Sequence, residues 1–200
     1  MTIKSEDIVK FWFEEIDPAQ HWKKDDNFDR EIERRFGPTL EIALQGGLWQ
    51  WRNISPIQPS QHQQHQNKQA QADPLGRLAE IIVLDQFSRN IYRGRAQSFA
   101  QDSMALVLAQ EAVSLGCFEP LSPRQQAFMI MPYMHSEATI IHQQAVMLFE
   151  KIGNPDNLNF ELRHQEIISR FGRYPHRNDI LERISTVEEV EFLQQPGSGF

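Results

Sequence analysis

The chain has 200 residues, of which 40% are hydrophobic and 24% are charged, and its formal net charge is −7. This length and balance fit one globular domain with a substantial core and exclude a largely disordered chain. The acidic excess also argues against non-specific binding to nucleic acid or to anionic membranes, because both kinds of binding need many Lys and Arg side chains.

Helical spacing of apolar residues runs through nearly the whole chain, and no segment shows the alternation of a β-strand. We therefore expect an all-α fold of about eight to nine helices. The expected helices in the first half are one capped by Ser5 that contains Ile8, Phe11 and Trp12; one from Asp25 or Asp26 to Gly46-Gly47, interrupted at Gly37-Pro38; and one from Asp73-Pro74 to the residue before Gly94. The expected helices in the second half are one from about Ser98 to Leu115; one that begins at Ser122-Pro123 and has a kink or break at Pro132; one that ends at Lys151, before Gly153; one from Asn157 or Asn159 to Phe171; and one from Ser185-Thr186 to about Gln194.

Residues 53–73 interrupt this helical pattern. They contain two prolines and the run Gln61-His62-Gln63-Gln64-His65-Gln66, with almost no apolar side chain to bury. We expect a polar, mobile loop inside a single helical domain of residues 1–195, followed by a disordered tail at 196–200. His62 and His65 can bind metal adventitiously, but an inserted polar loop is the preferred interpretation.

The sequence shows no signal for secretion or membrane insertion. Its first residues lack a basic segment followed by an apolar run, and no apolar stretch approaches the ~20 residues that span a bilayer. Cys117 is the one cysteine, so an intramolecular disulfide cannot form, which fits a reducing compartment. We expect a cytoplasmic protein, and the sequence leaves its oligomeric state open.

A Phe-x-Arg-x-x-x-Arg frame occurs twice, at residues 87–93 and 171–177. The two copies are not a recent duplication. The first can continue as one helix, whereas Gly172 and Pro175 end the helix inside the second.

Both frames lie in basic stretches of an acidic chain. Residues 84–95 carry three Arg and one Asp, a net charge of +2, and residues 162–183 carry five Arg and three acids, also +2. Arginines at helix ends are the simpler explanation, because they interact favourably with the helix dipole. A local basic concentration is also what an anion site requires. We therefore expect an arginine of each frame to meet around a shared anion.

Several blocks of the chain are similar to those of a known family. They are Phe11-Trp12-Phe13; Gly47-Leu48 with Trp51; Leu84-Asp85-Gln86-Phe87 with Arg89 to Gly94; Phe99-Ala100 with Asp102; Pro132 with His135-Ser136-Glu137; His164; Arg170 to Arg173 with Pro175 to Asn178; and Ser185-Thr186 with Glu188-Glu189. With these blocks the chain resembles the bacterial domain-of-unknown-function 924 family, which is placed among the tetratricopeptide-like helical folds. The resemblance implies a two-layer array of antiparallel helices and no reaction, since the family has no assigned activity. Ser88 and Glu182 depart from the family pattern, which usually has proline and often has glycine at these positions.

Candidate ligand-binding residues lie in and beside the two frames. They are Asp85, Gln86, Arg89, Asn90, Arg93, Arg173, Arg177 and Asn178. A salt-bridged, solvent-facing helix explains the first five equally well. The leading hypothesis is a helical binding protein whose guanidinium groups recognise a small phosphate or carboxylate ligand, or the acidic end of a peptide. In that hypothesis Asp85 and Glu137 hold the arginines and a nearby histidine in place.

The alternative is a small hydrolase- or lyase-like enzyme that acts on an anionic metabolite. Its candidate catalytic residues are His135, Glu137, His164 and His176, with one histidine as general acid/base. The sequence contains no nucleophile elbow, phosphate-binding loop or dinucleotide-binding turn, so binding is favoured over catalysis. We expect no cofactor and no metal. Glu161-x-x-His164 is a single motif of di-iron type, and buried His and Glu residues more often bind each other than a metal.

Overall fold

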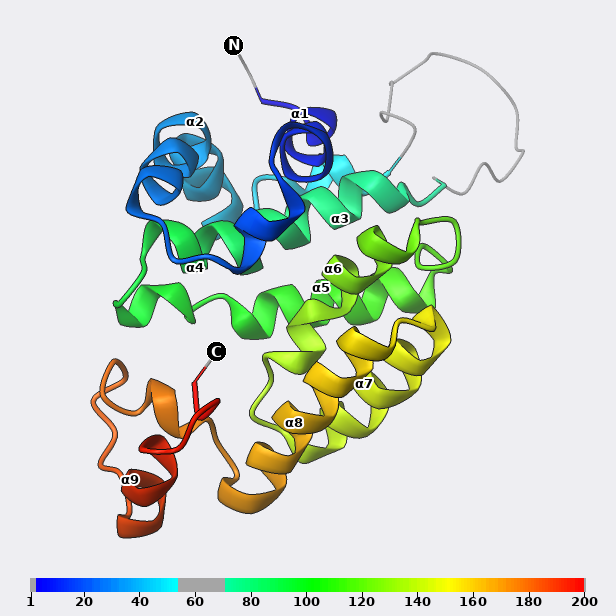
Figure 1. Ribbon diagram of the computed structural model, residues 1–200. Coiled ribbons are helices and arrows are strands. Elements are labelled where there is room, and N and C mark those ends of the chain that lie inside the picture. The colour runs from blue at the N-terminus through cyan, green and yellow to red at the C-terminus, as the bar shows by residue number, and fades with distance from the viewer. Residues whose placement is uncertain (1–2, 54–70, 200) are drawn as a thin grey trace, which may run out of the picture.

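The computed structural model describes residues 3–53 and 71–199, and within them the fold is all-α (Figure 1). The helices are α1 (Ser5–Lys10), α2 (Asp26–Leu44), α3 (Pro74–Ile82), α4 (Ser88–Ile91), α5 (Asp102–Ser114), α6 (Pro123–Met134), α7 (Thr139–Ile152), α8 (Pro155–Phe171) and α9 (Val187–Leu193). There are also two π-helical segments among the described residues. Phe11–Glu15 follows α1, and Val83–Phe87 joins α3 to α4. The predicted all-α fold is confirmed, and the tetratricopeptide-like arrangement stays a prediction.

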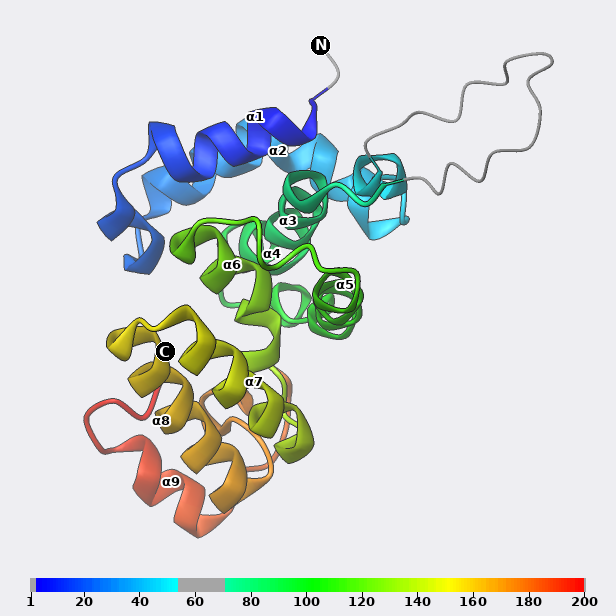
Figure 2. The same ribbon diagram turned by 90° about the vertical axis from the view of Figure 1, so that its right-hand side faces the viewer.

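The helices are stacked in layers that follow the chain from its N-terminus to its C-terminus (Figures 1 and 2). α1 and α2 lie at one end, α3, α4 and α5 in the middle, and α7 and α8 side by side beyond α6, with α9 at the far end. The most extensive contacts join α7 to α8, α6 to α7, α1 to α3 and α5 to α6. Most layers are therefore built from helices that are close in sequence.

One large apolar core runs from α1 to α7, and a small second cluster lies beside it. Phe11, Trp12, Phe36 and Phe87 form an aromatic centre in the large core, each with at most 1% of its surface exposed. Burial of such a side chain stabilises the fold by about 1.5–3 kcal/mol. The second cluster consists of Ile167, Ile168 and Tyr174, with Phe171 and Phe192 packed against it. The C-terminal segment, residues 173–199, therefore has few apolar contacts with the rest of the molecule.

The predicted interruption at Gly37-Pro38 was wrong. α2 runs without a break through Pro38, although proline removes one backbone hydrogen bond and crowds the preceding turn. Phe36, Leu40 and Ala43 are all buried on both sides of the proline, so their packing outweighs its local cost. Of the kink or break predicted at Pro132, the break does not occur, because α6 continues through Pro132 and ends two residues later, at Met134.

Helix caps explain the smaller shifts of the other boundaries. α8 begins at Pro155, earlier than predicted, because the side chain of Asn154 accepts hydrogen bonds from the first backbone N–H groups of the helix. α5 begins at Asp102 rather than near Ser98. The last helix is capped by Thr186, whose hydroxyl accepts from the backbone N–H of Glu189, while the Glu189 carboxylate accepts from the N–H of Thr186.

The two chain segments predicted to be mobile are described only in part. Most of the 53–73 loop lies outside the described residues, but its ends meet, because Asn53 and Ala72 form an antiparallel bridge. The tail is described to Gly199, and the Ser198 hydroxyl donates to the carbonyl of Leu193 at 3.1 Å, while its disorder stays a prediction. None of the described helices is long and apolar enough to cross a bilayer.

Candidate functional site

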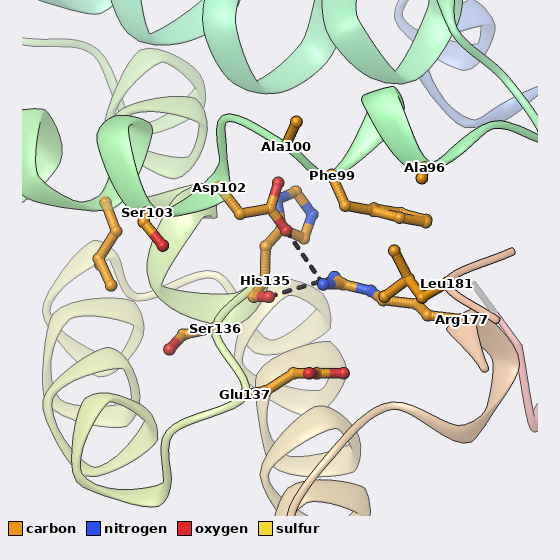
Figure 3. Close-up of a pocket in the computed structure, with 11 residues that line it drawn as sticks. Ala96, Phe99, Ala100, Asp102, Ser103, His135, Ser136, Glu137, Arg177 and Leu181 are labelled. Atoms are coloured by element: carbon orange, nitrogen blue, oxygen red, sulfur yellow. Dashed lines mark hydrogen bonds and ion pairs between the residues drawn. The ribbon is translucent and has the colours of Figure 1, made fainter. Parts of the chain in front are cut away.

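A pocket of about 270 Å³ lies between the start of α5, the turn after α6 and the C-terminal segment (Figure 3). Its polar lining residues are Asp102, Ser103, His135, Ser136, Glu137 and Arg177, and its apolar ones are Ala96, Phe99, Ala100, Leu106 and Leu181. A cavity of this size with a few convergent polar groups suits a small molecule. Three of the residues predicted from the sequence, His135, Glu137 and Arg177, line it.

Asp85 reaches His135, a lining residue, from the π-helical segment Val83–Phe87. Such segments are rare and occur frequently at functional sites. The Asp85 side chain is fully buried, and its carboxylate accepts hydrogen bonds from Nη1 of Arg89 at 2.9 Å, Nδ1 of His135 at 2.8 Å and the amide of Gln86 at 2.5 Å. These donors offset the loss of water around a buried charge.

The contact between Asp85 and His135 defines the protonation state of both residues. Burial alone would raise the pKa of Asp85, but the charge of Arg89 and the hydrogen bonds from His135 and Gln86 outweigh it and hold that pKa below its usual range. Burial and the charge of Arg89 lower the pKa of His135, despite the attraction of Asp85. Near neutral pH Asp85 is therefore a carboxylate that can only accept, and His135 is a neutral imidazole whose Nδ1–H donates to it.

The lone pair of His135 is consequently on Nε2, and His135 is one of the residues that line the pocket. Among the described residues no hydrogen bond or ion pair engages this atom. A histidine that lines a cavity, with its Nδ1–H held by a carboxylate and its Nε2 lone pair unengaged, is a candidate general base.

The two arginine frames converge, as predicted, and the anion that they share is Asp102. Nη2 of Arg89 and Nη1 of Arg177 both donate to Oδ2 of Asp102 at 3.0 Å. Nη2 of Arg177 also donates to the carbonyl of His135 at 3.1 Å, as Figure 3 shows. The shared anion is thus a side chain of the protein, so the convergence needs no external ligand to explain it.

Two other residues of the first frame bind α2 instead of lining the pocket. Arg93 donates to Asp29 through Nε and Nη2, and the amide of Asn90 donates to the same carboxylate at 2.8 Å. The basic excess of residues 84–95 is therefore balanced by Asp29 and Asp102, two acids from outside that stretch.

Residues of the second frame bind α9. Nε and Nη2 of Arg173 donate to the two carboxylate oxygens of Glu189 at 2.6 and 2.7 Å. The amide of Asn178 donates to the same carboxylate at 3.3 Å and to Ser185 at 3.0 Å. Arg173 and Asn178 are therefore placed as structural contacts of the C-terminal segment, away from the pocket lining.

Glu137 lines the pocket and also ties the C-terminal segment to the turn after α6. Arg183 donates to its two oxygens at 2.7 and 3.0 Å, and the backbone N–H of Tyr174 donates at 2.8 Å. Burial opposes ionisation of Glu137, but these donors outweigh it and lower its pKa, so the pocket wall carries a carboxylate.

The remaining candidate histidines do not line this pocket. Nδ1 of His164 lies 2.7 Å from the carbonyl of Phe160, and burial lowers the pKa of His164 to about 3. Burial lowers the pKa of His176 to about 4. Glu161 pairs with His142 rather than with His164, and in the described part of the chain no group of three His, Cys, Asp or Glu side chains is placed to hold a metal ion.

Sequence reasoning missed several residues that build the site. Asp102 and Ser136 belong to blocks that carry the family resemblance, which was a signal, but neither was given a role. Ser103, Leu181 and Arg183 had no signal in the sequence, because the fold alone brings them to the pocket or to Glu137.

Comparisons with known proteins agree with the resemblance. Residues 8–197 match the family model described as a bacterial protein of unknown function (DUF924). The fold is similar to that of a solved protein of unknown function from Agrobacterium tumefaciens, with 31% sequence identity, a TM-score of 0.81, and coverage of 95% of this chain and 96% of that chain. No curated protein matches the chain.

Proposed function

Because the chain belongs to the bacterial family of unknown function DUF924, its membership brings no activity with it, and we propose a function from the pocket itself. The protein is a small-molecule enzyme in which His135, oriented by Asp85, acts as general acid/base on a polar metabolite. The 2.8 Å contact between Asp85 and Nδ1 of His135 carries the proposal, because it leaves Nε2 as a base at the pocket wall.

Proton transfer is the chemistry that these residues support. Nε2 of His135 takes a proton from water or from a substrate hydroxyl or carbon acid, and Asp85 stabilises the imidazolium that forms. The same proton returns to the leaving group or product. Arg177 and the hydroxyl of Ser103 supply donors for substrate oxygens. A hydrolase- or lyase-like reaction fits this set of groups.

A ligand screen followed by an assay of conversion tests the proposal. Thermal shift against small phosphorylated, carboxylated and uncharged polar metabolites identifies ligands, and NMR of each hit detects a product. We expect a hit that the wild type converts and that His135→Gln binds without converting, because glutamine keeps a polar side chain but has no basic nitrogen. Conversion that survives in His135→Gln contradicts the proposal.

Recognition of a small anion or of an acidic peptide end is the second candidate function. One observation favours it: Arg177 lines the pocket, and its buried Nε–H has no hydrogen-bond partner in the part of the chain that the structure describes. It ranks second because Asp102 already balances the guanidinium charge. Binding alone would be established by an anionic ligand that neither the wild type nor the variants convert. Its affinity should fall in Arg177→Gln but not in His135→Gln.

A further inference from the structure

The turn that carries His135 is held by buried side chains from two directions. α6 ends at Met134, and the last carbonyl groups of a helix have no partner within the helix. The hydroxyl of Tyr174 donates to the carbonyl of Met134 at 2.5 Å, and Nη2 of Arg177 donates to the carbonyl of His135 at 3.1 Å. Both donors come from the C-terminal segment.

The next carbonyl, that of Ser136, is bound by a buried histidine–carboxylate pair. Nε2 of His142 lies 2.8 Å from this carbonyl oxygen, and Nδ1 of His142 lies 2.7 Å from Oε1 of Glu161. The side chains of His142 and Glu161 are both 0% exposed. Because a carbonyl oxygen only accepts, Nε2 of His142 must carry a hydrogen.

Nδ1 of His142 and Oε1 of Glu161 share a hydrogen bond. Burial raises the pKa of Glu161, which favours its acid O–H as the donor to Nδ1 of His142. The other oxygen, Oε2, is buried and has no hydrogen-bond partner among the described residues, which a neutral acid tolerates better than a carboxylate does. Glu161 therefore selects the tautomer of His142 that can bind Ser136.

We infer that Tyr174, Arg177 and His142 form a clamp that positions His135, and that Glu161 fixes the tautomer of His142 that the clamp requires. This inference rests on the proposed role of His135. Three successive carbonyl groups are fixed, so the imidazole stays in reach of Asp85 and at the pocket wall. A displacement of about 1 Å is enough to disable a general base.

NMR of the histidine side chains tests the clamp without a substrate. Two-bond 1H–15N spectra report which ring nitrogen carries the proton, and we expect the Nδ1–H form for His135 in the wild type. Glu161→Leu cannot donate to His142, so His135 should become a mixture of both tautomers. Glu161→Gln, whose amide N–H can replace the acid proton, should keep the wild-type signal.

Glu80→Leu is the matched control. Glu80 is also buried, with 1% of its surface exposed, but it pairs with Arg52 and not with a residue of the clamp. This variant should lose stability and keep the wild-type signal of His135. If the role of Glu161 were purely structural, Glu161→Leu should also lose stability and keep the wild-type signal of His135.

Each result decides the inference. An unchanged His135 signal in folded Glu161→Leu overturns it. If that variant does not fold, Tyr174→Phe removes the donor to Met134 together with the 3.3 Å contact between that hydroxyl and Nε2 of His142, and an unchanged His135 signal there overturns it instead. The wild-type spectrum tests the proposed function separately, because an Nε2–H form of His135 contradicts the general base whatever the variants show.

Discussion

At the scale of single residues, the site is built around two carboxylates, each of which accepts hydrogen bonds from more than one side chain. Asp85 binds Arg89 and His135, and Asp102 binds Arg89 and Arg177. A buried carboxylate with two such partners fixes their relative positions, and removing it leaves uncompensated positive charge. Asp102 therefore occupies the place that an external anion would take between the two frames.

Asp102→Ala should convert this place into an anion site. The loss of the carboxylate leaves Arg89 and Arg177 facing each other, which should destabilise the fold by about 3 kcal/mol. Sulfate should then raise the melting temperature of Asp102→Ala by several degrees and that of the wild type much less. Differential scanning fluorimetry with and without sulfate measures both, and equal shifts in the two proteins would show that Asp102 does not fill an anion site.

Because two histidines are buried and neutral, we expect the free energy of unfolding to fall with decreasing pH already at pH values above those at which carboxylates titrate. Burial lowers the pKa of His164 to about 3 and that of His176 to about 4, from 6.5 in the unfolded chain. Between these values the unfolded state binds more protons, so the free energy of unfolding falls as the pH drops below 6.5. Each group contributes roughly 1.4 kcal/mol per pH unit at most.

Urea unfolding at pH 7.0, 6.0 and 5.0 checks this prediction. The free energy of unfolding should decrease steadily over the series, and the pKa of His135, also lowered, adds to the same direction. A constant or rising value between pH 7.0 and 5.0 would contradict the assignment of these histidines as buried and neutral.

At the scale of elements, the C-terminal segment is attached mainly through polar contacts. Glu137 accepts from Arg183 and from the backbone N–H of Tyr174, and Asp102 accepts from Arg177. Within the segment, Glu189 on α9 accepts from Arg173, from Asn178 and from the backbone N–H of Thr186. The segment supplies Arg177 and Leu181 to the pocket, so its attachment also shapes the site.

Glu189→Ala should loosen this segment selectively. Hydrogen exchange of residues 173–193 should become roughly tenfold faster or more, while α6 and α7 keep their protection. Glu188→Ala is the control, because its pair with Arg170 is solvent-exposed and contributes about 0.5 kcal/mol or less. If both variants exchange alike, the buried contacts of Glu189 do not hold the segment.

Local signals in the sequence predicted most helices but not their special features. Proline and capping patterns located α3, α6 and α9, whereas the π-helical segment Val83–Phe87 has no signal, since its hydrophobic pattern is that of an ordinary helix. The prediction at Pro38 was wrong because it weighed one backbone hydrogen bond without the packing of α2.

The sequence predicted several residues of the site, but not which of them pair with one another. Arg89, His135 and Arg177 were all named, and an arginine of each frame was expected to share an anion. Asp102 lies 13 residues from Arg89 and 75 residues from Arg177, so counting nearby charges could not identify it as that anion.

At the scale of the whole molecule, the described residues form a continuous body, and we expect it to fold without residues 57–70. Asn53 and Ala72 are bridged, and the N–H of Asp73 donates to the carbonyl of Arg52 at 2.9 Å, so the chain ends on either side of this stretch already meet. Closing a loop of different length changes the free energy only slightly.

Replacing residues 57–70 by a short glycine–serine linker should therefore leave the melting temperature within about 2 °C of the wild type. Circular dichroism melts measure this directly. A loss of several degrees would show that the replaced residues contribute contacts to the body.

The central claim is that His135 presents an unprotonated Nε2 to the pocket near neutral pH. Diethyl pyrocarbonate modifies such a nitrogen, and peptide mass spectrometry locates the product, with fully buried His142 as the internal control. We expect rapid modification of His135 with half-maximal rate at a pH below 6.5, and no modification of His142 on that time scale. A half-maximal rate at or above pH 6.5, or no modification of His135, would contradict the account.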